Sequence, residues 1–175
     1  MNFPIISALI LFPTIGSIFL FFSKDNSENK LTTKYVALFT SIVNFLLSIY
    51  LWFLFDPTVS NFQFVEDRKW LVGFINYKVG IDGISILFIV LTTFITPICI
   101  ISCINSVKER VKEFLIAILV LETFMIGVFC SLDLVIFYLF FEAGLIPMFL
   151  IIGVWGGSRR VYSAFKFFLF TLLGS

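Results

Sequence analysis

Two glutamates lie within long apolar stretches of this chain, where an ionisable side chain is costly. Glu142 lies inside the run Leu134–Trp155, and Glu122 lies inside the preceding run Phe114–Ser131. An acid near the middle of a membrane helix costs roughly 2.5–3.5 kcal/mol on insertion scales, so it indicates a proton or ion site rather than a folding role alone. Glu142 is therefore the first candidate for proton translocation, and Glu122 is a candidate for a proton relay.

The short connection between the two runs places both carboxylates at one depth. Little more than Leu132 and Asp133 joins the runs, and each glutamate is ten residues from Leu132. At about 1.5 Å per residue, both lie about 15 Å from the helix end, near the middle of a ~30 Å hydrocarbon core. If the side chains face one another, they form a proton-transfer pair in which each raises the other's proton affinity. The alternative for Glu122 is a protonated acid that hydrogen-bonds to a Ser or Thr on a neighbouring helix.

Pro147 strengthens the functional interpretation of Glu142. Proline has no N–H, so the carbonyl of Ala143 loses its helical partner beside Glu142. Freed carbonyls at membrane depth are tolerated where side chains or water satisfy them, so we expect an opened helix and a wet pocket there. Lys166 is the basic residue inside a later apolar run, and we expect its side chain to reach the inner interface, with a proton-relay role as the alternative. Gly144 favours close helix approach at the same place.

The cysteines predict no cofactor site. Cys99 and Cys103 are one helical turn apart, so a metal or redox pair is the alternative, but the chain contains no histidine that could complete a site. We interpret these two residues and Cys130 as small buried apolar side chains. No metal, haem or iron–sulfur cluster is expected on this chain.

Composition identifies the elements that must position these residues. Of 175 residues, 60% are hydrophobic and 13% are charged, and the mean hydropathy is +1.09, far outside the range of soluble globular domains. We therefore predict an all-α integral membrane protein with five complete transmembrane helices plus a truncated sixth. The sixth begins near Val161 and its apolar part stops at Leu173, so it spans only about 20 Å. The predicted complete spans are residues 3–22, 35–55, 84–104, 114–131 and 134–155.

Three regions follow from these spans. Residues 1–55 contain helices one and two, residues 56–83 form an outer-side loop, and residues 84–175 contain helices three to six. The segment Lys69–Asp82 mixes β-branched and aromatic residues with Gly and Asn, which predicts a short β-hairpin, with a substrate site as the alternative. Asp82 is placed to cap the N-terminus of helix three.

Basic residues alternate between loops as the positive-inside rule requires. The net charge of +1 favours no nucleic-acid partner. The outer loop carries Arg68, Lys69 and Lys78, and the N-terminus is expected to face away from the cytoplasm or matrix. The basic residues expected on the inner side are Lys24, Lys30, Lys34, Lys108, Arg110, Lys112, Arg159 and Arg160.

The run Leu132–Gly156 resembles the fifth transmembrane helix of the chain 4 subunits of NADH:ubiquinone oxidoreductase, respiratory complex I, and of their bacterial chain M counterparts. The segments Val79–Ser85, Leu91–Phe94 and Phe165–Ser175 support the resemblance, which runs along the whole chain. It implies the N-terminal part, roughly the first third, of an antiporter-like inverted-repeat fold. The activity it implies is proton translocation coupled to electron transfer from NADH to ubiquinone.

The resemblance also implies roles and partners. Glu142 matches the family's helix-five glutamate, whose lysine partner belongs to a later helix that this chain does not include. Partners would be the remainder of subunit 4, adjacent antiporter-like subunits of the membrane arm, and lipids. NADH, FMN, iron–sulfur clusters and ubiquinone would belong to other subunits, because no glycine-rich dinucleotide loop or cluster-binding cysteine set is present.

Two other functions remain open from the sequence. One is a subunit of a multisubunit cation/proton antiporter, and the other is a structural membrane-arm segment without its own proton path. The expected location is the mitochondrial inner membrane, favoured by heavy use of Phe, Ile, Lys and Asn, with a bacterial plasma membrane as the alternative. Whether the chain is a fragment or one piece of a split subunit is left open.

Overall fold

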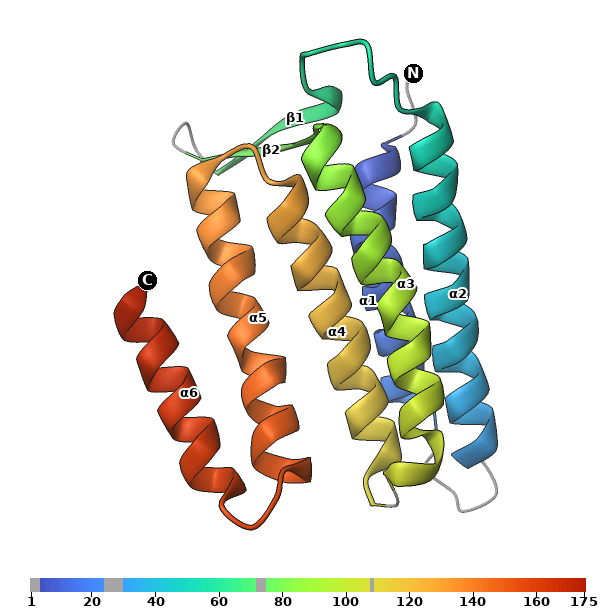
Figure 1. Cartoon of the computed structure of the whole chain (residues 1–175), viewed down its shortest axis with the longest axis vertical. Coiled ribbons are helices and arrows are strands. Elements are labelled where there is room, and N and C mark those ends of the chain that lie inside the picture. The colour runs from blue at the N-terminus through green and yellow to red at the C-terminus, as the bar shows by residue number, and fades with distance from the viewer. Residues whose placement is uncertain (1–3, 24–29, 72–74, 108) are drawn as a thin grey trace.

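The chain forms a bundle of helices with a β-hairpin at one end (Figure 1). A computed structural model describes residues 4–23, 30–71, 75–107 and 109–175. The helices are α1 (Ile5–Phe22), α2 (Lys30–Leu54), α3 (Gly83–Ser106), α4 (Val111–Cys130), α5 (Leu134–Trp155) and α6 (Arg160–Gly174), and the strands are β1 (Gln63–Leu71) and β2 (Ile75–Ile81).

The five expected spans are confirmed as helices. Each of α1 to α5 contains a stretch long and apolar enough to cross a membrane. The bounds of α5 match the prediction, and α2 begins five residues earlier than expected, at Lys30 rather than Tyr35. The short sixth helix is also present, with 15 residues in α6.

α4 is the central helix of the bundle, because it packs against α1, α2, α3 and α5. α5 and α6 continue the bundle to one side, and within the described residues α2 and α5 share no contact. Several small polar side chains lie inside the bundle, whereas Leu, Ile and Phe side chains cover much of its outer surface. This arrangement suits a lipid surround, in which the outer surface must be apolar. The buried polar residues are Ser17, Thr33, Thr40, Ser41, Asn44, Ser48, Thr93, Thr96, Glu122 and Thr123.

The predicted hairpin is confirmed, and it is longer than expected. The sequence predicts it within residues 69–82, but β1 begins at Gln63 and pairs antiparallel with β2. The pairing is irregular between Gln63 and Glu66, where the register shifts. The hairpin is attached to the turn between α4 and α5, because Val79 forms a bridge with Ser131 and the Leu132 N–H donates to the Lys78 carbonyl at 3.0 Å. Residues 72–74 lie outside the described residues.

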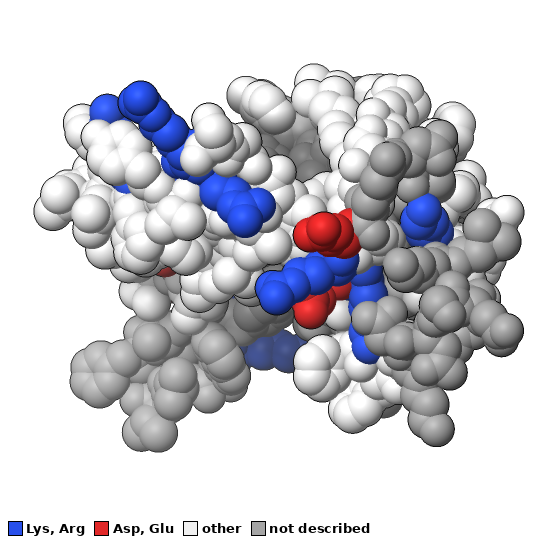
Figure 2. Space-filling view, turned by 90° about the horizontal axis from the view of Figure 1, so that it is seen from below, with Lys and Arg blue, Asp and Glu red and all other residues white. Residues whose placement is uncertain are grey.

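Basic residues gather at the opposite end of the bundle (Figure 2). Arg110 there lies 3.8 Å from the Glu113 carboxylate, an exposed pair one turn apart. Lys24 and Lys108 lie outside the described residues, as does the side chain of Lys30. The side of the membrane that this end faces stays a prediction. The described basic residues at this end are Lys34, Arg110, Lys112, Arg159 and Arg160.

Candidate functional site

Glu142 lies half-buried on α5, on the side that α6 covers. Its carboxylate accepts a hydrogen bond from the Ser175 hydroxyl, at the C-terminal end of α6. Lys166 is also on α6, but nine residues before Ser175, or about 14 Å along a helix. In the described part of the chain, neither a hydrogen bond nor an ion pair joins Lys166 to Glu142. The structure therefore brings α6 to Glu142 without bringing Lys166 to it.

Pro147 is buried in α5, and the helix continues through it to Trp155. The opened backbone and wet pocket expected beside Glu142 stay predictions. Gly144 permits less close packing than expected, because a Cβ added there would lie 3.6 Å from the Phe124 Cβ, an ordinary contact. The close approach of α4 and α5 occurs instead at Gly127, where an added Cβ would lie 2.6 Å from the ring of Phe140.

Glu122 is almost completely buried and faces α2. Its side chain is 2% exposed, and its Oε1 accepts a hydrogen bond from Asn44 Nδ2 at 2.8 Å. The alternative of a Ser or Thr partner is wrong, because the partner that α2 supplies is the amide of Asn44. Glu122 lies eight residues before the end of α4 and Glu142 eight residues after the start of α5. Their common depth in the membrane stays a prediction, and their hydrogen-bond partners belong to α2 and α6 respectively.

Polar contacts between other helices surround the Glu122 site. Thr14 on α1 and Thr123 on α4 have hydroxyl oxygens 2.9 Å apart, and Ser48 on α2 and Thr93 on α3 have theirs 2.6 Å apart. In hydrocarbon, such contacts are worth about 0.6 kcal/mol on average. The middle of the α1 to α4 bundle is therefore tied by side-chain hydrogen bonds between its helices.

A cluster of polar side chains around Glu66 lies where the hairpin meets α1. Glu66 on β1 accepts the backbone N–H groups of Ile6 at 3.0 Å and Ser7 at 3.2 Å, and it also accepts the Ser7 hydroxyl. Tyr77 on β2 places its hydroxyl 3.0 Å from the Ser7 hydroxyl, and burial raises the pKa of Tyr77. Pro4, at the N-cap of α1, makes no side-chain cap, so Glu66 supplies the cap from another element.

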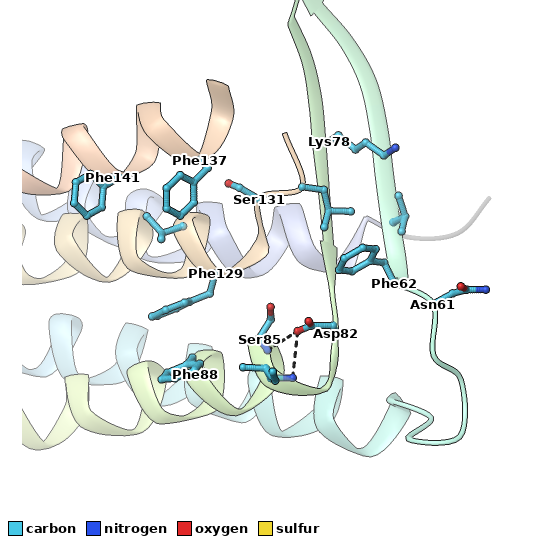
Figure 3. A pocket seen from close by; sticks show the side chains of 14 residues that line it. Asn61, Phe62, Lys78, Asp82, Ser85, Phe88, Phe129, Ser131, Phe137 and Phe141 are labelled. Carbon is cyan, nitrogen blue, oxygen red and sulfur yellow. Dashed lines mark hydrogen bonds between the residues drawn. The ribbon is translucent and has the colours of Figure 1, made fainter. Parts of the chain in front are cut away.

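The hairpin end of the bundle also contains a groove of about 980 Å³ between the hairpin, α3 and the turn from α4 to α5 (Figure 3). Aromatic rings form much of its wall, with Phe88 and Phe129 stacked at 5.1 Å between centroids. Asp82 lies at its edge and accepts the N–H groups of Ile84 at 3.2 Å and Ser85 at 2.7 Å, so its predicted role as the α3 cap is confirmed. These hydrogen bonds lower the pKa of Asp82.

The expectation that all three cysteines are buried is confirmed for Cys130, is wrong for Cys99 and holds only in part for Cys103. Cys130 is buried and Cys103 is partly buried, but Cys99 lies on the exposed face of α3, one turn from Cys103. In a membrane helix an apolar side chain suits a lipid-facing position as well as a buried one. The apolar character of Cys99 therefore did not predict that its side chain is buried. Among the described residues, no group of three His, Cys, Asp or Glu side chains could hold a metal ion.

Sequence reasoning missed three of these polar residues. Asn44 was detectable as an amide in the middle of an apolar span. Asp133 immediately precedes α5 and caps it by accepting the N–H groups of Val135 and Ile136, a position typical of an N-cap. No local signal could have found Glu66, because the helix that it caps begins some sixty residues away in the sequence.

Two family models together match nearly the whole chain. The model described as NADH-ubiquinone oxidoreductase chain 4, amino terminus, matches residues 8–128. The model described as NADH:quinone oxidoreductase/Mrp antiporter, TM, matches residues 131–175, which include α5, α6 and Glu142.

Individual proteins agree with these matches. NADH-quinone oxidoreductase subunit M of Rhodobacter capsulatus is 63% identical over 142 residues, covering 81% of this chain and 27% of the relative. NADH-ubiquinone oxidoreductase chain 4 of Marchantia polymorpha is 49% identical over 172 residues, covering 97% of this chain and 34% of the relative. A chain in the structure of respiratory complex I from Thermus thermophilus with bound NADH is 28% identical, with a TM-score of 0.80 over 97% of this chain and 33% of that one. The chain spans about a third of the length of these proteins.

Proposed function

This chain belongs to the family of NADH-ubiquinone oxidoreductase chain 4, whose amino-terminal part it matches, and on that basis we propose that it contributes to proton translocation in respiratory complex I. It is the N-terminal portion of an antiporter-like membrane subunit. The whole subunit would couple electron transfer from NADH to ubiquinone to proton pumping. One observation carries the proposal: a carboxylate, Glu142, lies half-buried within the apolar helix α5 of a chain that matches this family.

Glu142 is the proposed proton-carrying group. It has no cationic partner among the described residues, and its contact on α6 is the neutral Ser175 hydroxyl. A carboxylate that exchanges a proton normally needs a partner that changes its affinity for that proton, since charged neighbours shift a pKa strongly. The proposed partner is a lysine in the remainder of the subunit.

Glu122, Pro147 and Lys166 have secondary proposed roles. Glu122 would act as a relay that receives or gives a proton inside the α1 to α4 bundle, because it is the other acid in the middle of a span. Pro147 would open α5 beside Glu142, since it removes one backbone hydrogen bond there. Lys166 is exposed on α6, which supports an interfacial position more than a place in the relay.

The proposed setting is the membrane arm of complex I. Partners would be the remainder of subunit 4, adjacent antiporter-like subunits and membrane lipids, and NADH, FMN, iron–sulfur clusters and ubiquinone would belong to other subunits. The protein is a multi-pass membrane protein, and we place it in the mitochondrial inner membrane, with a bacterial plasma membrane as the alternative.

The test is the variant Glu142→Gln in assembled complex I, with Glu113→Gln as the matched control. Both changes remove one carboxylate, but Glu113 is exposed at the start of α4 and pairs only with Arg110. We expect proton pumping with Glu142→Gln to fall at least about tenfold, because transfer through a positioned acid contributes roughly 10²–10⁴-fold to a rate. Normal pumping and normal NADH oxidation in that variant would show that the assignment is wrong.

The same preparation separates two other functions. The description of the model that matches residues 131–175 also names the Mrp antiporter, which favours a multisubunit cation/proton antiporter as the second candidate. That candidate requires that no quinone reductase copurifies with the chain. A purely structural role requires that Glu142→Gln is silent while a bulky change, Gly144→Leu, prevents assembly.

A further inference from the structure

Among the described residues, two buried side-chain oxygen atoms have no hydrogen-bond partner. Asn44 is 0% exposed and Glu122 is 2% exposed, and the hydrogen bond from Asn44 Nδ2 to Glu122 Oε1 is 2.8 Å long. The other oxygen of each group, Asn44 Oδ1 and Glu122 Oε2, is buried and unpaired. Leaving such atoms unpaired away from water is unfavourable, so each requires an explanation.

Hydroxyl groups on the same two helices have hydrogen-bond partners. Thr40, Ser41 and Ser48 on α2 each donate to a backbone carbonyl of their own helix, at 2.8–2.9 Å. Thr123 on α4 does the same at 3.2 Å. Short hydroxyl side chains can return to the helix backbone in this way, whereas the amide of Asn44 and the carboxyl of Glu122 extend beyond it. These two groups therefore depend on one another.

No basic side chain lies at this depth in the described helices. α4 packs against α1, α2, α3, α5 and β2. Lys34 on α2 and Lys112 on α4 are ten residues from Asn44 and Glu122 respectively, about 15 Å along each helix. The titratable groups that the packed spans place nearer the middle are Tyr35, Tyr50, Cys99, Cys103, Cys130, Tyr138 and Glu142, none of which is a cation at neutral pH. The hairpin carries Arg68, Tyr77 and Lys78, and no ion pair joins them to Glu122 in the described part of the chain. An ionised Glu122 would therefore be a buried carboxylate without a counter-charge.

We propose that Glu122 is a protonated carboxylic acid that forms a closed pair with Asn44, a proton-holding site that joins α4 to α2. A protonated carboxyl has one O–H donor and an acceptor, and an amide has an N–H donor and a carbonyl acceptor. Asn44 Nδ2 donates to Glu122 Oε1, and the O–H at Glu122 Oε2 donates to Asn44 Oδ1. One proton thus satisfies both unpaired oxygens.

The pair gives Asn44 a positioning role. The Asn44 amide suits the protonated acid and not the carboxylate. If the proton left, Asn44 Oδ1 would face Glu122 Oε2, and both atoms are hydrogen-bond acceptors. The inference concerns the resting state of this pair and stands apart from Glu142, whose partner is on α6. If the proposed relay through Glu122 operates, the pair is the state from which the proton leaves.

The first test uses four variants of Glu122 and Asn44 in the assembled complex. Glu122→Gln keeps one donor and one acceptor opposite Asn44, so we expect wild-type amounts of assembled complex. Glu122→Leu and Asn44→Leu each leave one buried polar group unpaired, so we expect a several-fold loss of assembled complex. The double change to Leu removes both polar groups and should recover much of that loss. Ser41→Ala, one turn from Asn44, is the control and should resemble wild type because that hydroxyl is bonded only within its helix.

The second test observes the proton directly. In infrared spectra of the complex at neutral pH, subtracting Glu122→Gln from wild type should give the carbonyl stretch of a hydrogen-bonded protonated carboxyl. Asn44→Leu should shift that stretch toward the frequency of a carboxyl with fewer hydrogen bonds. A carboxylate stretch in its place, or assembly lost with Glu122→Gln as fully as with Glu122→Leu, would overturn the proposal.

These results are independent of the proposed function. Pumping by the Glu122→Gln complex reports whether the proton must leave this site, and the infrared band reports whether it is there at rest. Normal pumping by the Glu122→Gln complex, together with the band in the wild type, would retain the pair and exclude Glu122 from the relay. Loss of pumping in Glu142→Gln tests the other carboxylate without changing the band of Glu122.

Discussion

Replacing Glu66 should release the N-terminus of α1 from the hairpin. Glu66 accepts the N–H groups of Ile6 at 3.0 Å and Ser7 at 3.2 Å as well as the Ser7 hydroxyl. The first N–H groups of a helix have no intrahelical partner, and Pro4 supplies no side-chain cap, so these two amides depend on Glu66 for protection. We therefore expect their hydrogen exchange to accelerate in Glu66→Ala.

The magnitude follows from two contributions. Removing a capping side chain costs about 0.5–2 kcal/mol, and removing a negative charge from a helix N-terminus costs about 0.3–1 kcal/mol. Together they give about 1–3 kcal/mol, which corresponds to roughly 5- to 150-fold faster exchange. Glu66→Gln keeps an acceptor oxygen but loses the charge, so its increase should be smaller.

The assay is hydrogen exchange, read by mass spectrometry, of the peptide that contains the first turn of α1 in the intact complex. Asp67→Ala is the matched control, because Asp67 is the next residue of β1 and pairs across the hairpin with Lys78 rather than with α1. Unchanged exchange in Glu66→Ala would refute the cap. An equal increase in Asp67→Ala would show that the hairpin as a whole, and not the Glu66 carboxylate, protects the amides.

Three further predictions concern packing, acid stability and a helix end. Gly127→Ala should destabilise the bundle by about 1–3 kcal/mol, because the added Cβ would lie 2.6 Å from the Phe140 ring. Gly144→Ala on the facing helix is the control, since its added Cβ would lie 3.6 Å from the Phe124 Cβ, and thermal unfolding in detergent compares the two variants. The pKa of Asp82 is lowered from 3.8 by the N–H groups that it caps, so its stabilisation is present above that pH and is lost as the pH falls through the folded pKa. Asp82→Asn should therefore show a shallower acid decline in its unfolding midpoint, and an unchanged decline would contradict this cause. Lys112 donates to the carbonyls of Phe21 at 3.0 Å and Ser23 at 2.6 Å, at the C-terminal end of α1. Lys112→Met should therefore lower the free energy of unfolding by about 0.3–1 kcal/mol. The control, Arg159→Met at an exposed position, should give no measurable change.

The helices were predictable because their signal is local. A continuous apolar run of the right length forms a membrane helix regardless of its neighbours, so the bounds of α5 and the existence of all five spans followed from the sequence. The cap at Asp82 was predictable for the same reason, since its partners are two and three residues away. The hairpin was predicted too short because the irregular pairing near Glu66 has no simple alternation.

The sequence predicts the candidate site only in part. The sequence predicts one depth for Glu142 and Glu122, because helix rise and a short turn set how far each lies from the helix end. It could not determine the direction in which each side chain points, since that depends on the rotation of α4 and α5 against all their neighbours. Glu122 faces Asn44 on α2 and Glu142 faces Ser175 on α6.

The sequence by itself thus determined a membrane bundle, its approximate spans and the two acids within it. Only the tertiary structure decided that Asn44 accompanies Glu122 and that Glu66 caps α1. Those pairs join residues 78 and 60 positions apart. Contacts over such separations arise from how whole helices and strands pack, and no local pattern of residues encodes them.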